Sequence, residues 1–354
     1  MLDCRGDKCV GPVLPQVIID KGKGLAYPAG MESRIRKKVP FRIRLAGKII
    51  GKYLSLGRKM DSFCRRCENR YYTRTWRDEL DEESVRLLSL NADLKGTKTG
   101  KRCFVLGNGP SLKTENLGLL SKEDVFTVNQ AARNPQFSLL KPVCHFWADP
   151  AFFVIDENQA EDRELINVMN SINTPGNKPL CFFPVVEKGF VKRFQLDETL
   201  RVRYFYSTKL ITPDFSGEFD YTMRCPGFHG VVLWAIALAI YMGYSEIYVL
   251  GIDTTSLMVN MKSYLGQNDE TDYAYGITAN EQKRLSKMVR RQSLVTQADS
   301  FIQSLLEYEI LGRYCEARGI KLVNCSSITL VDTLPRMSLA DVLANHSQPQ
   351  QTVS

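Results

Sequence analysis

The sequence predicts an α/β fold, in which a doubly wound, mainly parallel sheet follows a basic helical N-terminal extension. From about residue 100 onward, short apolar runs alternate with amphipathic segments, which favours parallel strands joined by helices on both faces of the sheet. The apolar run after Arg102 enters the glycine-rich sequence Gly107-Asn108-Gly109-Pro110-Ser111, which is typical of a turn between a buried strand and a helix. With 354 residues, the chain has room for one large domain of this class and the extension.

Apolar runs of strand length and amphipathic segments of helix length define the expected elements. We expect strands at 102–107, 124–129, 143–149, 179–185, 201–206, 246–252 and 320–325. We expect helices at 160–172, 229–243 and 279–318, the last with a break, and a short closing helix with Ser338 as its N-cap.

The residues before the sheet are expected to form two further segments. Residues 1–30 are rich in Gly and Pro and show no sustained period, so we expect disorder there, as in the polar tail 346–354. Residues 31–97 are expected to form the basic helical extension, and a linker at 95–101 leads into the domain. Within the extension we expect a helix over residues 74–96, with its buried side formed by Leu80, Val85, Leu87, Leu88 and Leu90.

Positive charge is concentrated in the extension. Residues 31–60 hold ten Lys and Arg against one acid, Glu32, whereas the other residues of the chain are close to neutral. Apolar residues alternate with these cations, a pattern that favours contact with an anionic membrane surface. A solvated helical face is an alternative, and binding to the phosphates of nucleic acid is the least favoured one.

The ten cysteines indicate a reducing compartment. Cys103, Cys144 and Cys181 lie in apolar strand-like runs, which is typical of reduced thiols in a protein interior. Residues 1–15 lack the apolar core of a secretory signal, so we expect a cytoplasmic protein, with peripheral contact to the inner face of the cell membrane. A CxxC motif, Cys64 to Cys67, could bind zinc together with Cys4 and Cys9, but one such pair is weak evidence and we expect no metal site.

The glycine-rich turn is the first candidate for ligand binding. Glycine lets the backbone approach a ligand closely, and the N–H groups at a helix start favour an anion. The turn matches neither the GxGxxG pattern of dinucleotide folds nor a phosphate-binding loop with its lysine. We expect a phosphate-bearing ligand here, and a tight turn without a ligand is the alternative.

Polar residues follow four of the predicted strands. The carboxyl ends of parallel strands meet at one edge of a sheet, where ligands bind near the point at which the strand order reverses. Each residue alone could cap a helix, but the set predicts a site. Its members are Asn108, Asn129 with Gln130, Asp149, and Asp253 with Thr254 and Thr255.

Two blocks of the sequence resemble a known family. Residues 104–113 (FVLGNGPSLK), followed by 126–130 (FTVNQ), resemble the opening of the bacterial sialyltransferases of glycosyltransferase family 42. Residues 230–253 resemble that family's helix, GY-x-EIY strand and GID block. Motility accessory factor nonulosonate transferases and MptE-like pterin pyrophosphokinases are similar as well. The resemblance covers about residues 100–345 and leaves residues 1–97 without a counterpart.

The resemblance implies a Rossmann-like glycosyltransferase-type domain over residues 98–345. It implies transfer of a nonulosonate from a CMP-sugar to a glycan or glycolipid acceptor in polysaccharide biosynthesis, with no cofactor and no metal. The nucleotide-binding residues implied are Gly107, Asn108, Gly109, Ser111, Asn129 and Gly230. The residues implied near the donor sugar are Asp149 and Thr255, and both depart from the residue types that the family has there.

The catalytic base is the largest departure from the family. Family 42 enzymes use a histidine between the GID strand and the last strand, whereas the only histidines here are His145, His229 and His346. The catalytic candidates are therefore His229, Asp253, Tyr264 and Asp272, with Tyr264 supporting the departing phosphate. The loop 256–278 is rich in apolar and aromatic residues and is expected to close over the sugar as a lid.

Two other functions stay open. An MptE-like pyrophosphokinase would need ATP and Mg²⁺, and Asp149 and Asp253 could supply carboxylates for the ion. A non-catalytic nucleotide- or glycan-binding protein would keep the fold without the base.

Overall fold

The computed structural model describes residues 18–20, 24–26, 75–207, 210–265, 273–289 and 293–345. The chain divides into two compact units, residues 1–70 and residues 71–354. The basic segment 31–60, the CxxC motif with Cys4 and Cys9, and the tail 346–354 lie outside the described residues.

The described residues of the first unit form one short pair of strands. β1 (Ile18–Asp20) and β2 (Gly24–Ala26) pair antiparallel, within a segment that we expected to be disordered. Apolar residues flank a Lys-Gly-Lys-Gly sequence here, and such a pattern favours a hairpin over a structureless chain.

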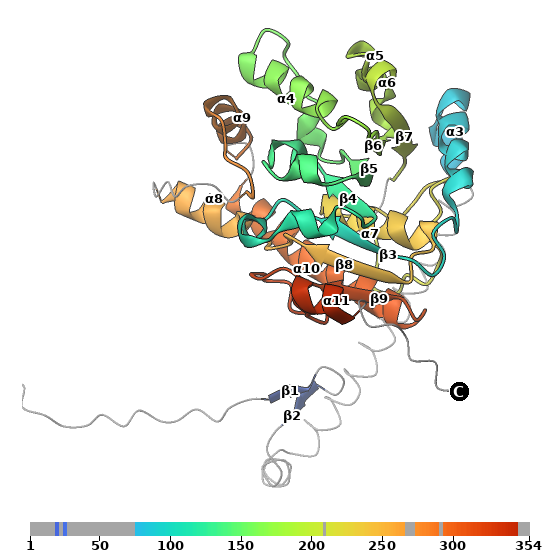
Figure 1. The fold of residues 1–354 in the computed structure, drawn as a ribbon, viewed down its shortest axis with the longest axis vertical. Helices are drawn as coiled ribbons and strands as arrows, with labels where there is room; N and C mark the ends of the chain where they lie inside the picture. The colour runs from blue at the N-terminus through green and yellow to red at the C-terminus, as the bar shows by residue number, and fades with distance from the viewer. Residues whose placement is uncertain are drawn as a thin grey trace, which may run out of the picture. The chain divides into compact units, whose positions relative to one another are not determined.

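The second unit is built on a parallel sheet, as predicted (Figure 1). In the described part of this unit, seven strands pair side by side in the order β7-β6-β5-β4-β3-β8-β9, and every pairing is parallel. The strands are β3 (Arg102–Leu106), β4 (Val125–Val128), β5 (Pro142–Phe146), β6 (Leu180–Pro184), β7 (Arg201–Phe205), β8 (Glu246–Leu250) and β9 (Lys321–Asn324). All seven predicted strands are confirmed, with bounds that differ by three residues or fewer.

The strand order defines a doubly wound, Rossmann-like sheet. The chain builds outward from β3 to β7 and then returns to place β8 and β9 on the other side of β3. The order therefore reverses between β3 and β8, which is where a ligand site is expected in such sheets.

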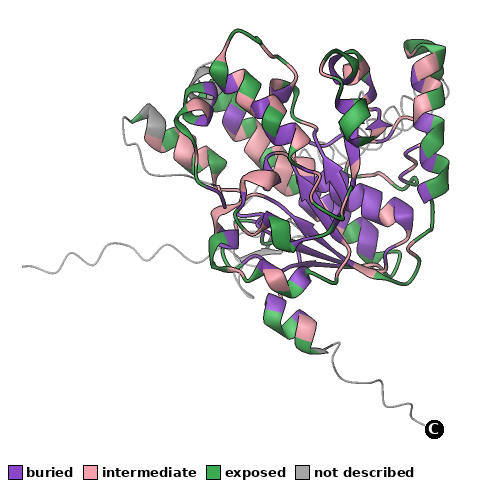
Figure 2. Cartoon of the chain, turned by 45° about the horizontal axis from the view of Figure 1, so that its top comes forward, coloured by how far each residue is buried: buried purple, intermediate pink, exposed green. Residues whose placement is uncertain are grey.

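Both faces of the sheet are covered, which explains the nearly continuous apolar strands. On one face, α7 (Val231–Met242) and α10 (Leu294–Glu316) pack against residues such as Val105 and Val249. On the other face, α4 (Ala160–Asn170) and α11 (Leu339–Asn345) pack in two separate hydrophobic clusters. The sheet strands in the centre of Figure 2 are accordingly buried along most of their length.

The helices agree with the prediction in most places. The expected helix 279–318 is divided into α9 (Ala279–Val289) and α10, which confirms the break. Ser338 is the N-cap of α11, because its Oγ accepts the N–H of Asp341 at 3.1 Å. The short helices that the sequence did not reveal are α5 (Lys188–Arg193), α6 (Leu196–Thr199) and α8 (Ser256–Tyr264). No helix among the described residues is long and apolar enough to cross a membrane.

Residues 75–97 correct the predicted domain boundary. The helix expected over 74–96 is three short elements: η1 (Trp76–Glu79), α3 (Glu82–Ser89) and η2 (Leu90–Leu94). The division occurs because Asp81 caps α3, its side chain accepting the N–H of Ser84 at 2.8 Å. These elements belong to the second unit and not to a separate extension.

The packing of these elements explains why they join the sheet unit. Trp76 and Leu88 are buried in a cluster with residues of β7, the edge strand. The Nδ2 of Asn91, also buried, donates to the carbonyl of Tyr204 at 2.7 Å. The expected burial of Leu90 was wrong, since its side chain is 47% exposed at the start of η2.

The cysteines that were expected in strands are buried there. Cys103, Cys144 and Cys181 lie on β3, β5 and β6 as free thiols. Burial raises the pKa of Cys181 to about 12, so this thiol is unreactive and acts as a small apolar residue.

A buried histidine makes the stability of the sheet depend on pH. His145 on β5 is fully buried, with its Nδ1 2.8 Å from the Oγ1 of Thr127, and burial lowers its pKa to about 3. The unfolded chain binds this proton at about pH 6.5, so acidification between these values favours unfolding. We expect His145 to lower the free energy of unfolding by about 1.4 kcal/mol per pH unit over this window.

Urea unfolding of the wild type and of His145→Leu between pH 4.5 and 7 measures this contribution. The variant can be less stable at every pH, but its free energy of unfolding should fall less steeply on acidification. Equal slopes for the two proteins would contradict the prediction.

Candidate active site

The turns after β3 and β8 meet at the point where the strand order reverses. The N–H of Gly107 donates to the carbonyl of Leu250 at 2.8 Å, and the N–H of Gly109 donates to that of Gly251 at 2.9 Å. A Cβ on Gly107 would lie 2.2 Å from the carbonyl oxygen of Gly251. The glycines are therefore required because two turns of the protein pack against each other here.

A buried carboxylate lies inside this pair of turns. Asp253 accepts from the N–H of Ser111 at 2.7 Å with one oxygen and from its Oγ at 2.5 Å with the other. Asp253 is 1% exposed, and burial raises its pKa, although the hydrogen bonds from Ser111 oppose this rise. A Cβ on Gly109 would lie 2.4 Å from Asp253 Oδ1, so the carboxylate also excludes a side chain at that position.

The predicted phosphate cradle is corrected by these contacts. The segment after the turn is η3 (Pro110–Thr114), a short 3₁₀ helix and not an amphipathic α-helix. The N–H groups of Gly109 and Ser111 already have protein acceptors, and that of Leu112 donates to the Gly109 carbonyl at 3.1 Å. The anion at this helix start is thus Asp253, so these N–H groups do not provide the cradle that we expected for a departing phosphate.

Asn108 and Asn129 lie on the β4 side of the same edge. Asn108 Nδ2 donates to the carbonyl of Val128 at 2.9 Å, which joins the turn to β4. The Oδ1 of Asn129 is buried and accepts no hydrogen bond from any described residue. An unsatisfied buried acceptor is costly, so this atom is suited to a ligand that donates a hydrogen bond.

Backbone strain is concentrated at this edge. Three non-glycine residues in the described part of the chain have a positive φ, and two of them lie in turns at this edge: Asn129 at 49° directly follows β4, and Thr254 at 57° lies in the turn after β8. The left-handed conformation costs a non-glycine residue of the order of 1 kcal/mol, and such residues occur preferentially at functional sites.

Residues 273–275 cover the glycine-rich turn. The N–H of Ala274 donates to the carbonyl of Asn108 at 2.8 Å, and Ala274 and Tyr275 are buried. The rings of Tyr273 and Tyr275 stack with centroids 5.2 Å apart. The predicted lid 256–278 thus includes a helix, α8, and a segment that packs against the turn, while its residues 266–272, including Asp272, lie outside the described part.

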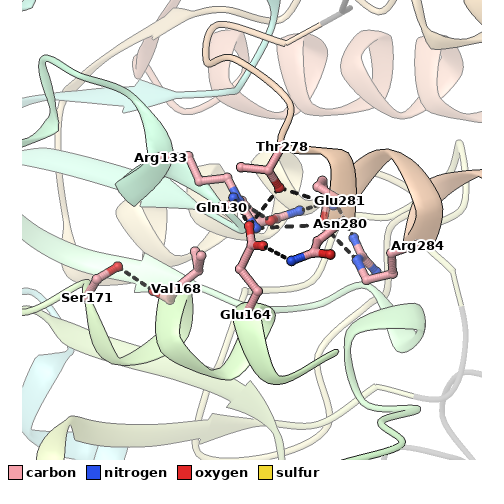
Figure 3. Close-up of polar contacts among 9 residues, drawn as sticks. All are labelled: Gln130, Arg133, Glu164, Val168, Ser171, Thr278, Asn280, Glu281 and Arg284. Atoms are coloured by element: carbon pink, nitrogen blue, oxygen red, sulfur yellow. Dashed lines mark hydrogen bonds and ion pairs between the residues drawn. The ribbon is translucent and has the colours of Figure 1, made fainter. Parts of the chain in front are cut away.

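A buried polar network connects the start of α9 to the end of β4 (Figure 3). Gln130 Nε2 donates to Glu281 Oε1 at 2.6 Å, and Arg284 donates to both oxygens of Glu281, at 2.7 and 2.9 Å. Glu281 is only 1% exposed. Gln130 directly follows Asn129, so the network connects the strained residue to α9.

The same network extends to α4. Glu164 accepts hydrogen bonds from Arg133 at 2.6 Å, from Thr278 at 2.7 Å and from Asn280 at 2.8 Å. The sequence did not predict this network, because each of its charged residues, taken alone, is typical of the solvated face of a helix. The spacing of Glu281 and Arg284, three residues apart on one helix, was the only local signal.

The two predicted donor-sugar residues hold helix starts. Asp149 Oδ1 accepts the N–H of Ala151 at 2.9 Å and thereby caps η7 (Pro150–Phe152). The carbonyl of Thr255 accepts the N–H of Met258 at 2.9 Å at the start of α8. Asp149 is exposed and Thr255 is half-buried, so both remain accessible at the carboxyl edge.

His229 pairs with an acid that the sequence did not point to. Its Nδ1 lies 2.8 Å from Glu307 Oε1, and its backbone N–H donates to Glu307 Oε2 at 2.8 Å. Gly230 follows as the N-cap of α7. Glu307 lies on the long, largely polar helix α10, where no sequence pattern distinguishes it from its solvated neighbours.

Two predictions remain: the role of Tyr264 and the absence of a metal site. Tyr264 ends α8, and its side chain lies outside the described part of the structure. Within the described ranges, no group of three or more His, Cys, Asp or Glu side chains is placed to hold a metal ion.

Comparison of the chain with known families and with curated proteins gave no match. No family model matches it. The search of curated proteins found none similar to it.

Several solved structures that are similar to the chain are bacterial glycosyltransferases. CstII, a sialyltransferase from Campylobacter jejuni solved with cytidine-5'-monophosphate, is 19% identical, with 68% of this chain and 86% of CstII covered and a TM-score of 0.37. Cst-I, a monofunctional alpha-2,3-sialyltransferase from the same organism, is 14% identical over 67% of this chain and 80% of Cst-I, with a TM-score of 0.38.

A third similar structure is MAf glycosyltransferase from Magnetospirillum magneticum AMB-1. It is 12% identical, with a TM-score of 0.37, and the match covers 72% of this chain but only 38% of MAf.

The packing at the glycine-rich turn predicts that one added methyl group strongly lowers the stability of the fold. Gly109→Ala should lower the free energy of unfolding by about 3 kcal/mol, because its Cβ would overlap Asp253. Gly189→Ala on α5 is the matched control, since a Cβ there meets nothing within 4 Å, and it should be neutral or stabilising by about 0.5–1 kcal/mol. Urea unfolding measures both, and equal stability of the two variants would contradict the packing.

The buried network predicts that Glu281 holds residues 273–284 against the sheet. Glu281→Ala removes the acceptor of Gln130 and Arg284, so amide hydrogen exchange should become faster across this segment. The control Glu157→Ala removes an exposed ion pair with Arg193 and should leave that exchange unchanged. Unchanged protection in Glu281→Ala would show that the network does not hold the segment.

Proposed function

We propose that this chain is a sialyltransferase-like glycosyltransferase. The observation that carries the proposal is the meeting of the two resembling sequence blocks: Ser111 of the first block bonds Asp253 of the second, 142 positions away. They meet where the strand order reverses, at the carboxyl edge of the sheet. The proposed donor is a CMP-linked nonulosonate, and the proposed acceptor is a hydroxyl group of a glycan or glycolipid.

The polar groups at the edge suit a nucleotide donor. We propose that Asn108 and Asn129 contact the nucleotide, with the buried Oδ1 of Asn129 accepting a hydrogen bond from it. Asp149 and Thr255 are proposed to lie beside the donor sugar. The segment 273–275 lies over the turn and would exclude water from the reacting groups.

The reaction that we propose needs no metal. The nucleoside monophosphate leaves as the anomeric carbon gains positive charge, and the developing charge of the phosphate needs hydrogen-bond donors. Asp253 is poorly placed to serve the alternative Mg²⁺-dependent pyrophosphokinase, because both of its oxygens already accept from Ser111. The basic segment 31–60 is proposed to meet an anionic membrane surface on the cytoplasmic side, where a lipid-linked acceptor would be available.

Thermal shift with nucleotides tests the donor class. We expect CMP and CDP to raise the melting temperature of the protein without Mg²⁺. UDP, GDP and ATP should change it little. Asn129→Gly should abolish this stabilisation while leaving the ligand-free melting temperature equal or higher, because glycine adopts the positive φ without strain.

Gln195→Gly is the matched control for this variant. Gln195 also has a positive φ, at 53°, but it precedes α6 and lies away from the carboxyl edge. It should gain the same relief of strain and keep the full response to CMP. A shift with ATP and Mg²⁺ alone would exclude the proposed donor and favour the pyrophosphokinase.

A further inference from the structure

One carboxylate holds both the backbone and the ring of His229. Glu307 reaches across from α10 and accepts the backbone N–H of His229 with one oxygen, while its other oxygen lies 2.8 Å from Nδ1. Two contacts to one carboxylate leave the imidazole ring little freedom to turn. The Glu307 side chain is 4% exposed and that of His229 is 23% exposed, so the acid is buried and the ring reaches the surface.

The start of α7 places His229 at the carboxyl edge of the sheet. Val232, in the first turn of α7, lies 3.4 Å from the position that a Cβ on Gly107 would occupy. The first turn of α7 therefore packs on the glycine-rich turn. His229 is three residues before Val232, at the same end of α7.

The pairing selects one form of the imidazole. A carboxylate accepts hydrogen bonds and does not donate them, so the proton of the neutral ring is held on Nδ1. The lone pair then lies on Nε2, which has no hydrogen-bond partner among the described residues. A histidine held in this way is prepared to take a proton at Nε2.

Glu307 has no other described hydrogen-bond partner. Burial raises its pKa, and the hydrogen bonds from His229 oppose the rise. A buried acid with a single hydrogen-bond partner stabilises the fold less than an apolar residue in the same place would. Such an arrangement is expected where the position of the histidine is needed for chemistry.

We propose that His229 is the general base of the transfer reaction and that Glu307 is its positioning residue. This inference rests on the proposed function. The Nε2 of His229 takes the proton of the acceptor hydroxyl as the hydroxyl oxygen bonds to the anomeric carbon of the donor. The bond from that carbon to the phosphate oxygen breaks, and its electron pair leaves with the nucleoside monophosphate. His229 then releases its proton to solvent.

Three variants separate the roles in this reaction. His229→Gln removes the base, and Glu307→Gln keeps the shape of the acid but offers an N–H group to the ring. Glu309→Gln is the matched control, because Glu309 lies on the same helix and forms an exposed pair with Arg313. The assay is release of CMP from CMP-N-acetylneuraminate with water as the acceptor, together with nitrogen chemical shifts of the labelled histidines.

The expected results are specific to a base and its positioning residue. His229→Gln and Glu307→Gln should each lower kcat about 100-fold or more with little change in KM for the donor, and Glu309→Gln should change neither. The nitrogen shifts should place the proton of His229 on Nδ1 in the wild type and in Glu309→Gln, but not in Glu307→Gln. His229→Gln identifies the signal among the three histidines of the chain.

Three results would overturn all or part of the inference, and they differ from one another. If the wild type releases CMP and His229→Gln does so at the same rate, the base is wrong while the proposed function stands. If the wild type releases no nucleotide from CMP-, UDP- or GDP-sugars, the proposed function fails and this inference fails with it. A proton on Nε2 in the wild type would exclude the role of Glu307 in either case.

Discussion

The bond between the Asp253 carboxylate and Ser111 is the contact on which the rest of the edge depends. It joins the turns after β3 and β8, the two neighbouring strands at which the strand order reverses. The two turns are packed so closely that neither glycine has room for a side chain: the backbone of Gly251 excludes one at Gly107, and Asp253 excludes one at Gly109. The groups left for a ligand lie on the β4 side, at Asn108 and Asn129. In this protein the reversal point is thus filled by protein groups, and the residues that we propose for the nucleotide lie to one side of it.

Three buried carboxylates hold three parts of the edge. Asp253 holds the glycine-rich turn, Glu281 holds the start of α9 through Gln130 and Arg284, and Glu307 holds His229. An acid in a protein interior is tolerated only when partners satisfy it, so each of these contacts fixes its partner strongly. The edge therefore consists of preorganised loops, which is what a reaction driven by positioning and hydrogen bonding requires.

The apolar strand runs were sufficient to predict the sheet, because strands buried on both faces must be apolar throughout. The break in the helix 279–318 and the cap at Ser338 followed from local sequence as well. Local reasoning failed over residues 74–96, where η1 ends at Glu79 and Asp81 starts α3 as its N-cap, while Trp76 and Leu88 pack in a cluster with residues of β7. It also failed for the phosphate cradle, since nothing near the glycine-rich turn reveals that an acid from a distant strand occupies it.

The sequence by itself determined the strands, the turns at their ends and the polar residues that those turns carry, because these follow from short-range patterns of burial and turn chemistry. Only the tertiary structure decided which polar groups are already satisfied and which remain available. Asp253, one of the predicted carboxylates, already accepts hydrogen bonds from Ser111, whereas Glu307 was not predicted from the sequence and yet holds His229. The reason is physical: a hydrogen bond between residues 78 or 142 positions apart depends on how the layers pack, and no local pattern encodes that packing.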